Sequence, residues 1–209
     1  MSIESNLKKI VSWESKLNPK SHTIFRLDSP NILKFSKKLL ENNIGLINQI
    51  LDSINKTVLD NFYTFRFSLG YVSIDEIILY IKPISKDEDK NGVEMDFNGR
   101  IQKMISHLTS KIAIHSYKNL YEGKLNLDLL PYYECKVWQV DKWNDVLEYI
   151  NERCNHHHRI IKNLLGSNYE QLSIETKLGM IIMLDKNKKI VSKYLDSKNI
   201  LLINYELIN

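Results

Sequence analysis

The sequence contains little glycine, proline, cysteine or alanine, and these shortages argue against several classes of protein and binding site. Seven glycines and four prolines in 209 residues argue against a low-complexity tail or a long flexible linker. The glycines are scattered, so no glycine-rich phosphate loop is present, which argues against a nucleotide cofactor. Two cysteines, Cys135 and Cys154, cannot form a disulfide framework. The single alanine, beside abundant Ile, Asn and Lys, points to an AT-rich coding genome, such as that of a virus or a low-GC bacterium.

Long hydrophobic runs are also missing. The longest apolar stretches are "IILYI" at 77–81 and "MIIML" at 180–184, far below the roughly 20 residues needed to span a bilayer. The N-terminal stretch is charged and amphipathic, unlike the apolar core of a secretory signal. We therefore expect a soluble, cytoplasmic protein that has no contact with a membrane and keeps its thiols reduced.

Charge of one sign is not concentrated anywhere. The net charge is +4, and Lys and Arg number nine against six acids in 1–60, ten against ten in 61–140 and ten against nine in 141–209. A nucleic-acid-binding protein usually carries a basic stripe on one face. This distribution favours another protein as the partner over a nucleic acid.

The hydrophobic periodicity predicts an α+β fold. We expect one domain over 1–209, with helical parts at 1–61 and 141–209 around a sheet-rich part at 62–140, and a central, mainly antiparallel sheet of about four to six strands. The expected helices cover 2–17, 30–40, 47–58, 101–108, 143–165 and 174–184; the expected strands cover 22–27, 63–69, 76–82, 93–97, 111–117 and 132–140. Residues 185–209 fit either short helices or a hairpin.

A histidine tract, "NERCNHHHRIIKNLLG" at 151–166, is the first candidate site. On a helix, Cys154 lies one turn from His157 and from His158, so either pair could supply two zinc ligands. The remaining ligands would have to come from elsewhere in the chain. The opposing interpretation places Cys154 and His157 in the apolar stripe of the helix, where they pack in the core. Successive side chains of a helix diverge by about 100°, so the three histidines point in three different directions.

A second candidate is the strand segment Glu134-Cys135-Lys136, in which alternation places Glu134 and Lys136 on one face. This acid-x-lysine step before a long helix resembles the core of the restriction-endonuclease-like nucleases. The resemblance implies an upstream aspartate and a Mg²⁺ ion that activates water for phosphodiester cleavage. Asp128 is our candidate for that aspartate, with Asp75 and Asp96 as alternatives.

No complete catalytic set or nucleotide motif is present in the sequence. The leading hypothesis is therefore a non-catalytic protein-interaction module without a cofactor, such as a regulator, an inhibitor, an immunity-type protein or an assembly subunit. The alternative hypothesis is a metal-dependent nuclease that uses Glu134, Lys136 and Asp128 with Mg²⁺ or Zn²⁺.

Overall fold

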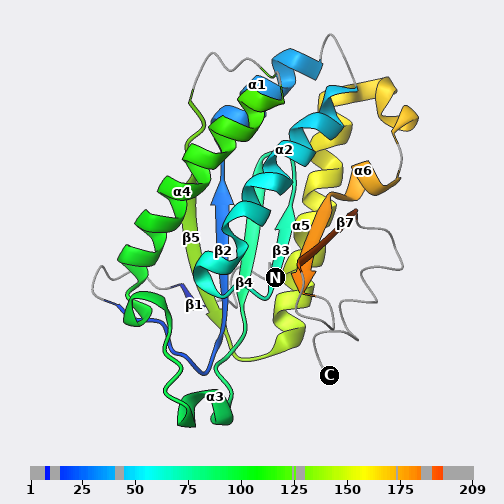
Figure 1. The fold of residues 1–209 in the computed structure, drawn as a ribbon. Helices are drawn as coiled ribbons and strands as arrows, with labels where there is room; N and C mark the ends of the chain where they lie inside the picture. The colour runs from blue at the N-terminus through cyan, green and yellow to red at the C-terminus, as the bar shows by residue number, and fades with distance from the viewer. Residues whose placement is uncertain are drawn as a thin grey trace.

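The computed structural model describes residues 8–9, 15–40, 45–123, 125, 130–172, 174–184 and 190–194, and these form helices packed on both faces of one sheet (Figure 1). The strand order is β1-β5-β2-β4-β3-β6-β7. Every neighbouring pair is antiparallel. The predicted α+β class with a mainly antiparallel sheet is confirmed.

The strands come from the beginning, the middle and the end of the chain. They are β1 (Lys8–Lys9), β2 (His22–Asp28), β3 (Leu69–Val72), β4 (Glu76–Ile81), β5 (Glu134–Val140), β6 (Met180–Leu184) and β7 (Ile190–Tyr194). The predicted central position of the "EIILYI" strand is confirmed, because β4 lies in the middle of the sheet and all six of its residues are buried.

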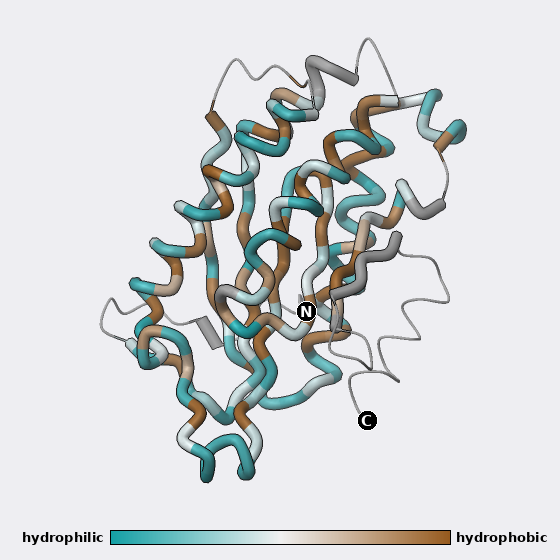
Figure 2. Tube along the Cα trace, viewed as in Figure 1, coloured by the Kyte–Doolittle hydropathy of each residue, from teal (hydrophilic) through white to brown (hydrophobic). Residues whose placement is uncertain are grey.

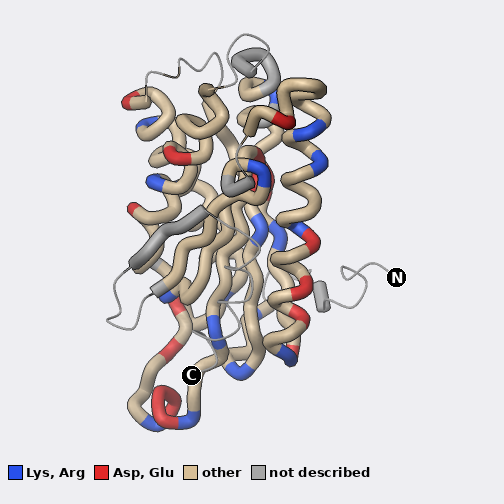
Figure 3. Tube along the Cα trace, turned by 90° about the vertical axis from the view of Figure 1, so that its right-hand side faces the viewer, with Lys and Arg blue, Asp and Glu red and all other residues tan. Residues whose placement is uncertain are grey.

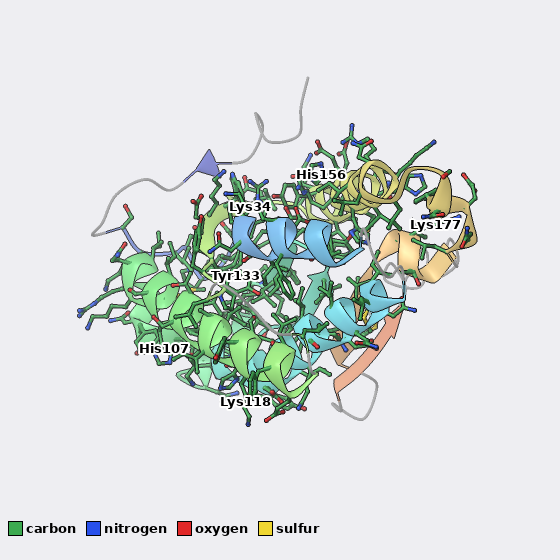
Figure 4. All side chains as sticks on the ribbon, turned by 90° about the horizontal axis from the view of Figure 1, so that it is seen from above. Lys34, His107, Lys118, Tyr133, His156 and Lys177 are labelled. Carbon is green, nitrogen blue, oxygen red and sulfur yellow. The ribbon has the colours of Figure 1, made fainter. Side chains whose placement is uncertain are left out.

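Six α-helices surround the sheet in the described part of the chain. They are α1 (Pro30–Leu40), α2 (Leu46–Asn61), α3 (Lys86–Lys90), α4 (Ile101–Glu122), α5 (Trp143–Leu165) and α6 (Ile174–Leu178). Short 3₁₀ turns are η2 (Phe62–Phe65), η3 (Asp96–Gly99) and η4 (Gly166–Gln171). Helices α2 and α4 cover one face of the sheet, α5 covers the other, and α1 lies across one end (Figures 1 and 4). No described helix is both long enough and apolar enough to cross a membrane.

Strand alternation divides the core into two layers. On the α2/α4 side, β2 contributes Phe25 and Leu27 to the larger cluster. On the α5 side, β2 contributes Ile24, which packs with Trp138 and Tyr149 in a second cluster. Hydrophobic segments accordingly concentrate on the strands and on the inward sides of the helices, whereas α3 is hydrophilic (Figure 2).

Two strands predicted in the middle of the chain, at 63–69 and 93–97, are wrong. The aromatic alternation at 63–69 belongs to the turn η2 and to Arg66, whose φ of 55° is left-handed. Its phenylalanines are buried although no strand forms before Leu69. The segment 93–97 leads into the turn η3. At 63–69, aromatic burial by a folded turn imitates the pattern of a half-buried strand, whereas at 93–97 Phe97 is 42% exposed and has left-handed backbone angles.

Helix α4 is much longer than the predicted 101–108 and includes the predicted strand at 111–117. In that segment the helix buries Ile112 and Ser116, four residues apart, which is a helical spacing. The opposite error occurs at 180–184, which forms β6 instead of a helix. Gly179, with a φ of 90°, separates α6 from β6.

The chain ends are described only in part. Of the predicted helix at 2–17, Lys8–Lys9 forms strand β1 instead, paired with β5. Most of the rest of that prediction, at 2–7 and 10–14, lies outside the described residues. In 185–209, the described strand β7 pairs antiparallel with β6, so residues 190–194 form a strand and not a helix. The rest of the hairpin alternative lies outside the described residues.

Candidate functional site

Two acidic segments meet at the end of the sheet that α1 covers. Asp28 is the last residue of β2, and Asp75 and Glu76 lie where the β3–β4 turn enters β4. Asp28 pairs in register with Glu76, and the Ser29 backbone N–H donates to the carbonyl oxygen of Asp75 at 2.8 Å. The antiparallel pairing of β2 with β4 therefore brings together acids that are 47 positions apart in the sequence.

The β3–β4 turn holds Asp75 through its first residue, Ser73. The Ser73 backbone N–H donates to the carbonyl oxygen of Glu76 at 2.8 Å, and the Glu76 N–H donates to Ser73 Oγ at 3.1 Å. Ser73 Oγ also donates to a carboxylate oxygen of Asp75 at 3.2 Å. The turn thus fixes both the backbone and the side chain of Asp75.

Glu76 is an ion-paired carboxylate, with a side chain only 2% exposed. Arg153 of α5 donates from Nε and from one terminal nitrogen to its two carboxylate oxygens, at 2.9 and 2.6 Å. Arg26 Nε lies 3.7 Å from the same carboxylate and 3.1 Å from Asp28 Oδ2. Burial raises the pKa of Glu76, and the two guanidinium groups oppose that shift. A bidentate contact of this kind gives directional as well as electrostatic binding.

Besides its two acidic partners, Arg26 contacts an aromatic ring and a hydroxyl group. Its guanidinium lies over the Trp138 ring, 5.2 Å from the centroid, and donates to the Tyr149 hydroxyl at 3.3 Å. These contacts join β2, β5 and α5 beneath the carboxylates. The acids are therefore held by a packed network and not by a loop alone.

Asp28 and Asp75 are electrostatically coupled. Burial raises the pKa of Asp75, and the charge of Asp28 raises it further, while Ser73 and Arg153 lower it. A cation bound between the two carboxylates would remove this repulsion. Hard oxygen ligands suit Mg²⁺, which is typically held by one or two carboxylates plus substrate phosphates and water. The donor set of Asp28 and Asp75 therefore fits a divalent cation that arrives with a phosphate ligand.

Basic side chains of α5 lie at the same end of the sheet. Along α5 the charges change from acidic to basic (Figure 3). In the sequence, the basic part of α5 contains Arg153, Arg159 and Lys162, and Arg153 is bound to Glu76. His156 belongs to the same half by its place in the sequence, and Figure 4 shows its side chain on α5. Its pKa is lowered to about 4, first by partial burial and then by the charges of Arg153 and Arg159. This electropositive region is suited to an anion.

The residues predicted from the acid-x-lysine step border this site. Glu134 is the register partner of Asp28, and Lys136 is the register partner of Arg26. Both side chains are exposed, as expected for the outer half of β5. The alternative aspartate Asp75 belongs to the site, whereas Asp96 lies in η3. Asp128 lies outside the described residues.

The histidine tract does not converge on one point. His157 is fully buried, and its Nε2–H donates to the carbonyl oxygen of Thr176 at 3.2 Å. His158 bonds instead to the Tyr169 hydroxyl, 2.6 Å from Nδ1. Cys154 is buried in the α5 cluster. Within the described ranges, no three His, Cys, Asp or Glu side chains form a group that could hold a metal ion.

Sequence reasoning missed Asp28, Glu76 and the two arginines. The available signal was an acid at the end of the strand "HTIFRLD" and a double acid at the start of "EIILYI", because strand ends are where functional residues gather. The pairing of these two strands was not predicted. Without it, the separate acids resemble ordinary turn and cap residues.

A model of the tRNAHis guanylyltransferase family, Thg1, matches residues 5–141, which is more than half of the chain and includes Asp28, Asp75 and Glu76. The chain belongs to the tRNAHis guanylyltransferase family. This membership overturns the expectation of a non-catalytic protein-docking module and also the nuclease alternative. It likewise corrects the expected partner, because the family is named for an enzyme that acts on tRNA.

Solved structures share the fold of this guanylyltransferase-family chain. A bacterial tRNA(His) guanylyltransferase (Thg1)-like protein in complex with GTP has a TM-score of 0.73 at 16% identity, covering 92% of this chain and 91% of that one. A bacterial Thg1-like protein in complex with ATP has a TM-score of 0.70 at 15% identity, with coverages of 94% and 92%. The tRNA(His) guanylyltransferase of Saccharomyces cerevisiae gives 0.61 at 14% identity, with coverages of 90% and 95%. No curated protein sequence matches the chain.

Proposed function

We propose that this chain transfers a guanylyl group from GTP to a tRNA, with Asp28 and Asp75 as the carboxylates at the reacting phosphates. The single observation that carries the proposal is the coupled carboxylate pair at the junction of β2 and β4, within the segment that matches the family. In the reaction, an oxygen of the tRNA attacks the α-phosphorus of GTP. The bond to pyrophosphate breaks as the new phosphorus–oxygen bond forms.

Asp28 and Asp75 would hold a divalent cation that enters with the triphosphate. Such a cation, when bound, offsets the charge that develops on the phosphate oxygens and on the leaving pyrophosphate. The N-terminal amide groups of α1, which begins two residues after Asp28, provide a further anion-binding feature at the same edge. The absence of a glycine-rich loop therefore does not argue against a nucleotide substrate.

The remaining residues of the site position the two aspartates. Arg153 neutralises Glu76, so the carboxylate that pairs in register with Asp28 does not add a further uncompensated charge. Arg26 binds both Asp28 and Glu76 and fixes their separation. The basic half of α5, including Arg159, supplies positive potential for the triphosphate or for the tRNA backbone.

The test is a transfer assay with radiolabelled GTP, tRNA and Mg²⁺, comparing the wild type with Asp75→Asn and Asp28→Asn. Each substitution keeps the shape of the side chain and removes its charge. Electrostatic help from a bound metal is worth several kcal/mol, so each variant should lose roughly 100-fold or more in rate. Asp87→Asn, on the exposed helix α3, is the matched control and should keep the wild-type rate. A wild type that labels no tRNA, or an Asp75→Asn variant as active as the control, would contradict the proposal.

We also propose that the chain acts in the cytoplasm. Support comes from its two cysteines, Cys135 and Cys154, which are both free thiols as expected in a reducing compartment.

A further inference from the structure

The outer side of α4 carries an unusual mixture of lysines and exposed rings. The helix turns Met104, Leu108 and Ile112 toward the core. Its other side presents a stripe at helical spacing, made of Lys103, His107, Lys111, Ile114, Tyr117, Lys118 and Tyr121, which we call the α4 stripe. Figure 4 shows His107 and Lys118 on the side of α4 that faces away from the sheet.

The charged side chains of the α4 stripe are all lysines. Three lysines lie on α4 against a single acid, Glu122. Glu122 lies near Lys118 but also binds Lys56 of α2 at 3.1 Å. Among the described residues, neither Lys103 nor Lys111 has an acidic partner within ion-pair distance. The even charge distribution along the sequence therefore conceals a local excess of positive charge on this helix.

Rings flank the lysines at both ends of the stripe. Near the end of α4, Tyr117 and Tyr121 are stacked, with centroids 6.3 Å apart and planes 21° apart, and Tyr121 is 64% exposed. Near the start, the ring of Phe97 lies 5.3 Å from that of His107. Phe97 is 42% exposed and has left-handed backbone angles, a strained conformation that sets its ring beside the helix.

We infer that the α4 stripe is an RNA-binding surface, on which lysines contact successive phosphates and the two ring pairs stack on unpaired bases. Interleaved cations and aromatic rings are the physical pattern of a surface that follows a nucleic-acid backbone. The 22 residues of α4 extend roughly 33 Å at 1.5 Å per residue. That length can contact several successive nucleotides.

The position of the stripe agrees with the proposed function, on which this inference rests. The Ser116 and Tyr133 hydroxyls are 2.7 Å apart and join α4 to the segment before β5. The next residue, Glu134, pairs in register with Asp28. The Tyr117–Tyr121 end of the stripe is therefore close to the candidate reaction site, and a tRNA bound along α4 would run from the reacting phosphates toward Phe97.

The first experiment measures the Kd for tRNA by fluorescence anisotropy over a range of KCl concentrations. Each phosphate contact contributes about 0.7 to 0.9 to the slope of log Kd against log salt. The double variant Lys111→Gln/Lys118→Gln removes two such contacts and should therefore reduce the slope by about 1.4 to 1.8. Lys86→Gln/Lys90→Gln on α3 removes the same charge from an exposed helix at the far end of the sheet and should keep the wild-type slope.

Tyr121→Ala tests the rings separately from the charges. Loss of one stacked base should weaken binding roughly 5- to 150-fold without changing the salt slope. Circular dichroism shows whether each variant is folded, and Lys118→Gln alone, at a 65% exposed side chain, serves if the double variant is not. A Lys111→Gln/Lys118→Gln slope equal to that of the α3 control overturns the inference. A change of oligomeric state with an unchanged slope also overturns it, and assigns the stripe to a protein contact.

The outcome is distinguishable from a failure of the proposed function. A wild type that labels tRNA while the stripe variants bind like the wild type leaves the activity standing and refutes the surface. A wild type that labels no tRNA but binds it with a slope that depends on Lys111 and Lys118 refutes the activity and supports the surface.

Discussion

Acidification should destabilise this protein through His157. The imidazole is fully buried on α5, and burial is the main reason that its pKa is lowered from 6.5 to about 4. Its Nε2–H donates to Thr176, while Nδ1 has no hydrogen-bond partner among the described residues. A proton added to Nδ1 would therefore have to be buried without an acceptor.

The size of the effect follows from proton linkage. The unfolded chain binds a proton at His157 below about pH 6.5, whereas the folded chain does so only below about pH 4. Stability from this group is therefore fully present above pH 6.5 and is lost as the pH falls. The loss relative to pH 7 is about 2 kcal/mol at pH 5 and about 3 kcal/mol at pH 4.

The measurement is urea unfolding between pH 7 and pH 4.5, comparing the wild type with His157→Gln. The glutamine amide can still donate to Thr176 but cannot bind a proton, so the variant should lose about 2 kcal/mol less than the wild type over the range from pH 7 to pH 5. Cys154→Ala is the matched control on the same buried stripe. The pKa of that thiol is raised to about 12 by burial, so its removal should lower stability equally at every pH. Parallel pH profiles for the wild type and His157→Gln would refute the assignment.

Two further substitutions test how the site and the C-terminal strands are held. Arg153→Met should cost about 3 kcal/mol, because it leaves the buried carboxylate of Glu76 without its bidentate partner. The Arg153→Met/Glu76→Gln double variant should recover at least about 1 kcal/mol in a thermal-unfolding cycle, and additive costs would mean that the pair is not coupled. Gly179→Ala should cost about 2 kcal/mol or more, because φ is 90° and a Cβ would lie 2.7 Å from the Val72 carbonyl oxygen. Gly92→Ala, where φ is 70° and the added Cβ meets nothing, should cost only about 1 kcal/mol, and equal costs would exclude the steric contact.

The sequence predicts correctly those parts of the fold in which apolar residues recur with one dominant period. Helices α2 and α5 repeat apolar residues every three or four positions, and β4 is apolar on both faces, so each was found near its observed bounds. Segments whose pattern satisfies both periods were assigned wrongly, such as 111–117 within α4. In that segment the packing of α4 against α2 and β5 determines that a helix forms and not a strand, and a local sequence pattern does not contain that information.

The site was harder to predict than the fold because its charges belong to four different elements. Asp28 ends β2 and Arg26 precedes it by two residues, Asp75 lies in the β3–β4 turn, Glu76 begins β4, and Arg153 comes from α5. Only the β2–β4 register and the docking of α5 bring them within a few ångströms of one another. The acid-x-lysine step identified the neighbouring strand, because β5 flanks β2, but assigned it the wrong chemistry.

The proposed function conflicts with the expectation drawn from the shortage of glycine. It assumed that triphosphates are bound by backbone amide groups in a tight loop, which requires glycine. Under the proposed function, a pair of carboxylates such as Asp28 and Asp75 would bind the same ligand through a cation instead, and would need only a strand end and a short turn. A shortage of glycine therefore excludes one way of binding a nucleotide. It does not exclude a nucleotide bound through a cation that acids at the ends of adjacent antiparallel strands would hold.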